Sequence, residues 1–458
     1  MGNQIVKKSH ERSIDSVDTF IEDKNNSLNT QDPAIVNHIK TNKELSHQTK
    51  DIENHKINLP PLDGARGYLV VLGAFFVQFL CFGVASACVL QDIFEQIFKD
   101  ESDVQLKLSF AGTLMEAFVN LMGPLAQIIL ARYGIHYLLL SGSFLAVLGL
   151  MMAGFTTEIW HLYLCQGVVF GSGASLLYCT VLTAVPQWFD KKKGLAVGLF
   201  GSGSGAGGLI LPFILNAVNH SLGTGWTYRI LGFIVLGCCI FACSLVRERV
   251  PRERTNRPIK DLFDFSVFKD LTFVLWFFGS MISLMGFFVP FFFLPSYTRY
   301  IGLSTEQGSA LVAVMSASNF IGRILVGFTA DRIGLLNTDI IFRMLCGLSS
   351  FLIWTFAYSY GVLMAFCVIF GLFCGSYFTL CSPITMDIVG AEKFATGLSM
   401  VIMGNIVSVF GPSIASGIES KIGEPYFVYK IFTGTVYIFG GFILILCKFK
   451  IGKFWSKM

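Results

Sequence analysis

Two ionisable side chains lie deep inside long apolar blocks of the sequence: Arg323 and Glu116. Such groups are costly to bury in an apolar medium and usually serve binding or proton transfer. A buried guanidinium holds a carboxylate through two parallel hydrogen bonds, so Arg323 is a candidate anion-binding group, with an ion pair to another helix as the structural alternative. Glu116 fits either a proton-accepting group or a structural partner, and both interpretations stay open.

Uncharged polar residues in the same blocks are further candidates for contact with a bound solute. These are Asn120, Tyr178 and Tyr377, and for each of them a hydrogen bond between helices is the structural alternative. The twelve Cys residues lie in or at the edge of apolar blocks and lack the Cys/His spacing of a zinc site. We therefore expect neither a metal nor a cofactor.

The elements that position these residues are twelve apolar blocks. About 20 helical residues cross the ~30 Å hydrocarbon core of a bilayer. Backbone N–H and C=O groups in lipid need partners within the protein, so each block predicts a membrane-spanning α-helix. The blocks cover 68–90, 109–131, 136–155, 160–183, 194–218, 227–246, 271–295, 308–330, 339–357, 362–385, 395–418 and 427–447.

Charge is sparse and unevenly placed. Charged residues make up 14% of the chain, against about 25% in a typical soluble protein. With an even number of spans, the loops on the side of the termini carry 17 Lys and Arg and the opposite loops carry 6, which predicts cytoplasmic termini. The basic cluster from Arg247 to Lys260 then belongs to a cytoplasmic loop, and we expect no nucleic-acid partner. We favour the plasma membrane, with the vacuole or another internal membrane as the alternative.

A weak repeat at an offset of 200 residues relates the two halves of the chain. Arg132-x-Gly134 returns as Arg332-x-Gly334, and Phe170-Gly171, Lys193 and Pro212 return in the same way. Two parallel six-helix halves are the architecture of major facilitator carriers, so we predict an all-α integral membrane protein with twelve transmembrane helices in two six-helix halves. The predicted parts are a disordered cytoplasmic tail (1–62), the two halves (63–246 and 271–447), a basic linker (247–270) and a short C-terminal tail (448–458).

A loop motif strengthens this resemblance. The run Gly327-Phe328-Thr329-Ala330-Asp331-Arg332-Ile333-Gly334 resembles the major facilitator motif G-x-x-x-D-R-x-G. An acid and a base at a helix end can hold one half against the other until the carrier rocks, so Asp331 and Arg332 are predicted gating residues, together with Lys191, Lys192 and Lys193 before the fifth span. Positive-inside anchoring is the alternative. The equivalent N-terminal loop has Ala131 in place of the acid.

Three further segments resemble the monocarboxylate-porter family, in the style of its fungal homologues. They are Trp188 to Val197 with the glycines that follow, Pro60 to Tyr68 before the first span, and Asp264 to Phe268 before the seventh. The resemblance covers roughly residues 60–450. It implies that Arg323 is the span-eight arginine that this family associates with the carboxylate of its substrate.

The chain also departs from that family. Where lactate–proton carriers have an Asp one turn before the arginine and a Lys in the first span, this sequence has Asn319 and a position near Ser86. Asn cannot titrate and Ser carries no charge, so the resemblance does not predict lactate–proton symport by the usual residues. It still implies other cargoes, such as larger organic anions, aromatic amino acids or riboflavin, and Glu116 is then the candidate for a co-transported proton.

The function that the sequence predicts is secondary transport of a small organic solute across a bilayer by alternating access. The solute is a monocarboxylate-like anion or a larger aromatic compound. A non-transporting nutrient sensor on the same fold is the alternative, because the polar tail could recruit signalling partners. An enzyme is not expected, since no Gly-x-Ser-x-Gly or His-Glu-x-x-His motif is present.

Overall fold

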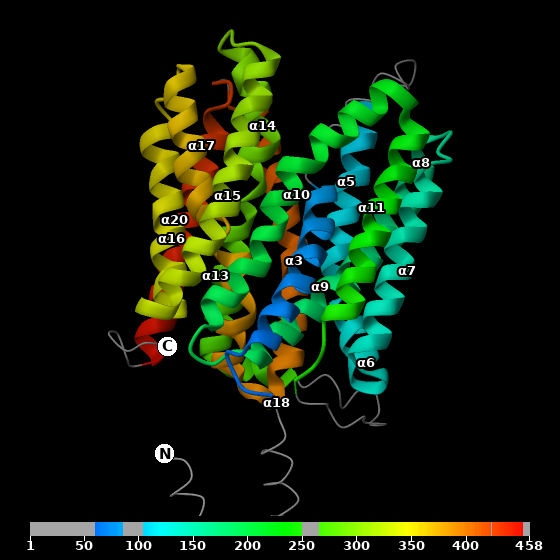
Figure 1. Cartoon of the computed structure of the whole chain (residues 1–458). Helices are drawn as coiled ribbons and strands as arrows, with labels where there is room; N and C mark the ends of the chain where they lie inside the picture. Colours follow the sequence, from blue (N-terminus) through cyan, green and yellow to red (C-terminus); the bar gives the residue numbers. More distant parts are fainter. Residues whose placement is uncertain (1–59, 86–103, 250–264, 423, 452–458) are drawn as a thin grey trace, which may run out of the picture. The chain divides into compact units, whose positions relative to one another are not determined.

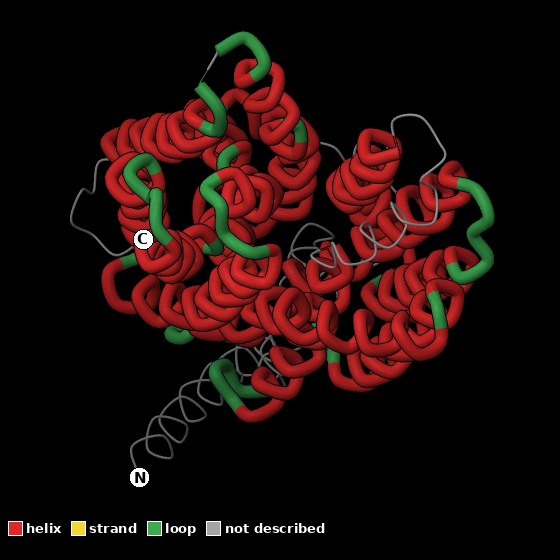
Figure 2. Tube along the Cα trace, turned by 90° about the horizontal axis from the view of Figure 1, so that it is seen from above, coloured by secondary structure: helices red, strands yellow, loops and turns green. Residues whose placement is uncertain are grey.

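The computed structural model describes residues 60–85, 104–249, 265–422 and 424–451. Ser86, nearly all of the predicted N-terminal tail, most of the basic linker and the end of the C-terminal tail lie outside these ranges. All regular secondary structure within them is helical, and Figure 2 shows the helices from above in two groups.

The N-terminal half contains the first six spans. Its elements are α3 (Ala65–Ala85), α5 (Val104–Leu121), α6 (Gly123–Tyr133), α7 (Ile135–Ala153), α8 (Ile159–Leu162), the π-helix η1 (Tyr163–Phe170), α9 (Gly171–Ala184), the 3-10 helix η2 (Val185–Trp188), α10 (Lys193–Leu222) and α11 (Thr224–Leu245).

The C-terminal half contains the other six. Its elements are the 3-10 helix η3 (Phe265–Lys269), α13 (Leu271–Met285), α14 (Phe288–Tyr300), α15 (Thr305–Ile333), α16 (Leu335–Ser349), the π-helix η4 (Ser350–Trp354), α17 (Tyr360–Cys374), α18 (Ser376–Val409), α19 (Gly411–Glu419) and α20 (Phe427–Ile451).

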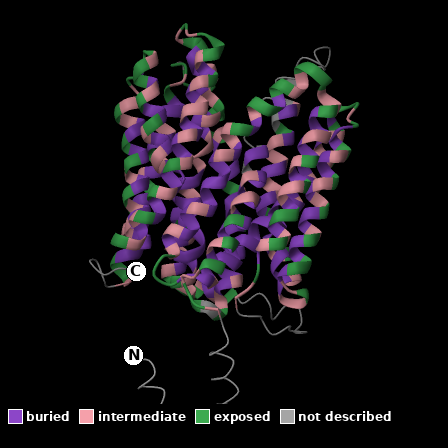
Figure 3. Cartoon of the chain, viewed as in Figure 1, coloured by how far each residue is buried: buried purple, intermediate pink, exposed green. Residues whose placement is uncertain are grey.

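The predicted spans agree with these helices. Within the described ranges, 11 helical stretches are long and apolar enough to cross a membrane, and the shorter apolar helix Ala65–Cys81 occupies the position of the first predicted block. Outward-facing apolar side chains such as Phe144, Phe213 and Leu352 are largely exposed, as expected for surfaces that meet lipid, while buried residues fill the interior of each half (Figure 3).

Glycines end several spans. Gly134 (φ 85°) and Gly334 (φ 100°) follow α6 and α15, in the left-handed region that disfavours other residues. These two positions belong to the 200-residue repeat, so the repeat marks equivalent turns in the two halves. Gly390 (φ 75°) lies inside α18 at a kink, and it separates the tenth span from the eleventh.

The two halves meet most closely between α10 and α15. A methyl group added at Gly194, Gly198 or Gly205 would lie within 2.5–2.7 Å of the α15 backbone. Only glycine permits this approach, which is the role expected for small residues between membrane helices. Two other glycines of α10, Gly203 and Gly207, contact α3 in the same way.

The contacts between halves concentrate at one end of the bundle. We call this the basic end, because Lys191, Lys192, Lys193 and Arg332 lie there; it is at the bottom of Figure 1. About 12–15 Å from the basic end, Ser382 Oγ donates to Leu182 O at 2.7 Å, and Gly123 packs against Ser399. Toward the opposite end, the far end, the ribbons of the halves diverge, and α14 packs on α15, α19 and α20 of its own half.

Candidate solute-binding site and gate

Arg323 lies in α15 where the two halves meet. Its side chain is only 2% exposed. From the N-terminal half, a methyl group at Gly201 would lie 3.7 Å from Arg323 Nη1. From its own half, a methyl group at Gly375 would lie 3.1 Å from Arg323 Nε, so glycine leaves the room that the guanidinium occupies.

The partners of the Arg323 guanidinium are few. Nε donates to Asn319 Oδ1 at 2.9 Å, and the guanidinium carbon lies 5.1 Å from the centre of the Phe378 ring. Nη1 is buried without a hydrogen-bond partner, and no described acid forms an ion pair with this side chain. A buried cation in this state can accept an anion with little rearrangement.

Two of the predicted site residues are brought to Arg323. Asn319 orients it, and the Asn319 amide is fixed in turn by a hydrogen bond from Nδ2 to Cys374 Sγ (3.1 Å). Tyr178, from α9 of the other half, lies near Arg323. Both are buried, so Arg323, Asn319 and Tyr178 form one polar cluster that spans the two halves.

Tyr377 has partners within its own half. Its hydroxyl lies 2.9 Å from Asn405 Oδ1 and its ring packs near Trp276. This is the interhelical hydrogen bond that the sequence analysis kept as the structural alternative.

Glu116 and Asn120 lie together on α5. The Asn120 amide donates to the Glu116 carbonyl of the same helix (2.8 Å), so its side chain is occupied within one helix. Glu116 is 9% exposed, and no described residue forms a hydrogen bond with its Oε2. It lies near Cys81 of α3, which also lies near Tyr178.

Asp331 forms the main polar contact between the halves at the basic end. Its Oδ1 accepts from the backbone N–H of Gly194 at 2.7 Å, and its Oδ2 accepts from that of Leu195 at 2.9 Å. These N–H groups open the 30-residue helix α10, where free donors and the helix dipole favour a carboxylate. We call this contact the latch.

The predicted basic gating residues lie around the latch but do not form it through their side chains. Arg332 places its guanidinium 4.0 Å from the centre of the Phe328 ring. Lys191 and Lys192 are exposed and Lys193 is half-buried. Among the described residues, no three His, Cys, Asp or Glu side chains are grouped as ligands for a metal.

Comparison with known sequences identifies the family. A sequence profile described as the Major Facilitator Superfamily matches residues 70–412. The chain belongs to the major facilitator superfamily.

Relatives that align with this chain over most of their own length support this assignment. The MFS-type transporter pynF of Aspergillus niger is 30% identical over 397 residues, covering 85% of this chain and 90% of that protein. The agnestins efflux protein of Paecilomyces divaricatus is 32% identical over 392 residues, covering 84% and 88%. These names do not specify a monocarboxylate porter, so the finer resemblance stays a prediction.

Solved structures confirm the fold of this major facilitator protein. The Escherichia coli fucose:proton symporter superposes with a TM-score of 0.67 at 14% identity, covering 83% of this chain and 98% of that one. A human organic anion transporter gives a TM-score of 0.65 at 13% identity, covering 82% and 99%. The predicted all-helical fold with two six-helix halves is thus confirmed.

A buried ion pair was not expected from the sequence. Besides Arg323 and Glu116, the ninth apolar block also holds Asp339 and Arg343, which pair at 2.6 Å with side chains 0% and 1% exposed. Ser376 Oγ donates to Asp339 at 2.8 Å, and Arg343 Nη1 donates to Gly279 O at 3.1 Å. The spacing of four residues between opposite charges was the available signal.

Asp63 was also missed as a functional candidate. Its carboxylate accepts from the backbone N–H groups of Asp190, Lys191 and Lys192 at 3.2–3.4 Å. The loop before α10 is therefore held by Asp63 on one side and by Asp331 of the latch on the other. In the sequence, Asp63 lies within the Pro60–Tyr68 segment that resembles the monocarboxylate-porter family, but the resemblance assigned it no role.

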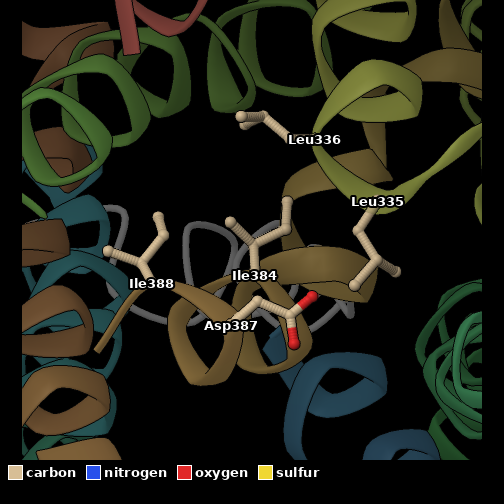
Figure 4. Close-up of a pocket in the computed structure, with 5 residues that line it drawn as sticks. All are labelled: Leu335, Leu336, Ile384, Asp387 and Ile388. Atoms are coloured by element: carbon tan, nitrogen blue, oxygen red, sulfur yellow. The ribbon is translucent and has the colours of Figure 1, made fainter. Parts of the chain in front are cut away.

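A small pocket opens near the basic end, lined by Leu335, Leu336, Ile384, Asp387 and Ile388 (Figure 4). Its cavity volume is about 10 Å³, roughly the space of one water molecule. It is too small for an organic solute. In this major facilitator protein the Arg323 cluster is the better candidate for the solute site.

Proposed function

We propose that this chain is a secondary transporter of an organic anion, with Arg323 as the group that binds the anionic end of the solute. The observation that carries the proposal is a buried guanidinium between the halves with a free Nη1 and no acid partner among the described residues. An unpaired buried charge costs several kcal/mol, and a bound carboxylate removes that cost.

Alternating access then uses the two halves, residues 63–246 and 271–447, as the moving bodies. The latch holds the basic end closed, and the positive-inside rule assigns that end to the cytoplasm. With the latch intact, a solute reaches Arg323 from the far end; with the latch broken, it reaches Arg323 from the cytoplasm.

The efflux named for the agnestins relative favours export as the direction, and the plasma membrane as the place. Phe378 beside Arg323 favours an aromatic or larger organic acid over lactate. Membership of the monocarboxylate-porter family would be compatible with such a cargo.

The test is transport of a panel of labelled organic acids by cells and by proteoliposomes. Arg323→Ala should reduce transport by at least about 100-fold, because it removes the charge and the two hydrogen bonds that a guanidinium can donate to the carboxylate of the solute. The variant protein should still reach the membrane. Arg299→Ala, an exposed arginine at the far end, is the matched control and should transport normally. Normal transport by Arg323→Ala would remove Arg323 from the site.

Deletion of residues 1–55 separates transport from sensing on the same fold. A carrier should move the same solutes at the same rate without the tail. A sensor should lose its cellular output and show no flux in proteoliposomes with or without the tail.

A further inference from the structure

Gln78 is a buried amide whose hydrogen-bonding groups are unused. It lies in α3, it is 0% exposed, and neither Nε2 nor Oε1 has a hydrogen-bond partner among the described residues. Buried amides are normally satisfied, and an exception calls for a specific explanation. The sequence analysis did not single it out.

The neighbours of Gln78 on α3 define the direction in which it faces. Successive residues of a helix are about 100° apart, so Gln78 lies about 60° from Cys81 on one side and about 60° from Phe75 on the other. Cys81 Sγ donates to Ala174 O of α9, and the Phe75 backbone contacts Gly203 of α10. Gln78 therefore faces the space between α9 and α10.

Arg323 approaches this side of α3 through α9. Tyr178 lies near Arg323 and one helical turn after Ala174, the residue that Cys81 contacts one turn from Gln78. Depth agrees as well. At 1.5 Å per residue, Gln78 lies about 20 Å from the start of α3 and Arg323 about 15 Å from the end of α15, both measured from the basic end.

We infer that Gln78 is the second polar contact of the solute site, in the half opposite to Arg323. An amide both donates and accepts but carries no charge, so it selects a neutral hydrogen-bonding group, a hydroxyl or a carbonyl, on the part of the solute remote from the carboxylate. The substrate class is then a hydroxy- or oxo-substituted organic acid. This inference rests on the anion site proposed at Arg323.

The first test compares binding of benzoate and para-hydroxybenzoate, which differ by one hydroxyl, to the purified full-length protein in nanodiscs. The wild-type protein should bind para-hydroxybenzoate about tenfold more tightly, the effect of one good hydrogen bond. Gln78→Met, which keeps the length of the side chain, should abolish this preference. A preference that survives in Gln78→Met overturns the inference.

Gln127 provides a matched control. It is also a buried glutamine with both amide atoms unpartnered, but it lies in α6, about 9 Å from the basic end. Gln127→Met should keep the full preference for para-hydroxybenzoate. Equal loss of preference in both variants would show a general effect of removing an amide, and would overturn a specific role for Gln78.

The second test needs no ligand. An amide that awaits a solute destabilises the empty protein, so Gln78→Met should raise the melting temperature of the ligand-free protein. A lower melting temperature would show that the amide has a structural partner, and would overturn the inference. If neither acid binds the wild-type protein, the anion site at Arg323 fails for this class, and the melting temperature still decides the role of Gln78.

Discussion

The C-terminal half contains two buried arginines, and their surroundings differ. Arg343 pairs with Asp339 four residues earlier, donates to Gly279 O, and places its guanidinium carbon 5.7 Å from the ring centre of Trp276 and 5.6 Å from that of Tyr377. Arg323 also has a residue four positions earlier, but that residue is Asn319, and Nη1 remains unpartnered.

The contrast separates structure from function within one helical bundle. The Arg343 charge is compensated inside a single half, so it can stay fixed while the halves move. The Arg323 charge, at the boundary between the halves, has no compensating acid among the described residues. A bound anion can therefore compensate it. Burial alone, which the two share, does not distinguish the roles.

The largest expected effect comes from breaking the structural pair. Asp339→Asn leaves Arg343 charged and buried without its carboxylate, which should cost about 3–5 kcal/mol of stability. Thermal unfolding of the purified protein measures this loss. The double variant Asp339→Leu with Arg343→Met removes both charges and should recover most of it. A single variant as stable as the wild type would contradict a structural role for the pair.

A second change makes Arg323 resemble Arg343. Asn319→Asp puts a carboxylate at the same spacing of four residues, so it should occupy the guanidinium and reduce anion transport about tenfold at neutral pH. Protonation of this Asp would free Arg323, and because the paired guanidinium favours the ionised carboxylate, transport should rise only at pH values well below neutral. Transport assays at two pH values measure the effect, with Asn405→Asp as a control for an added acid elsewhere. Unchanged transport at neutral pH would contradict the proposed site.

The smallest effect concerns the latch. Like Arg323, it lies at the boundary between the halves, but it lies at the basic end and not in the proposed solute site. Asp331→Asn removes a charge from the start of α10, a loss of about 1 kcal/mol. The basic end should therefore open several-fold more often. Maleimide labelling of Ser382→Cys, at the contact between halves, measures this opening, with and without Asp331→Asn. Equal labelling rates would show that Asp331 does not hold the halves together.

The sequence could predict much of the fold because the information is local. A hydrocarbon-length run of apolar residues identifies a span without reference to any other span. The turn glycines Gly134 and Gly334 mark equivalent helix ends in the same local way. The loop motif singled out Asp331, although the motif did not say that its carboxylate accepts backbone N–H groups from α10.

By itself, the sequence of this protein determined the helices, the duplication and the presence of a charge at Arg323. Only the tertiary structure decided which polar groups have partners: Arg343 with Asp339, Asp63 with the loop before α10, and Gln78 with none in the described part of the chain. The physical reason is that hydropathy is a property of one segment, whereas a hydrogen bond or an ion pair depends on how each helix is rotated and placed against its neighbours. A span can be recognised alone, but a site exists only between spans.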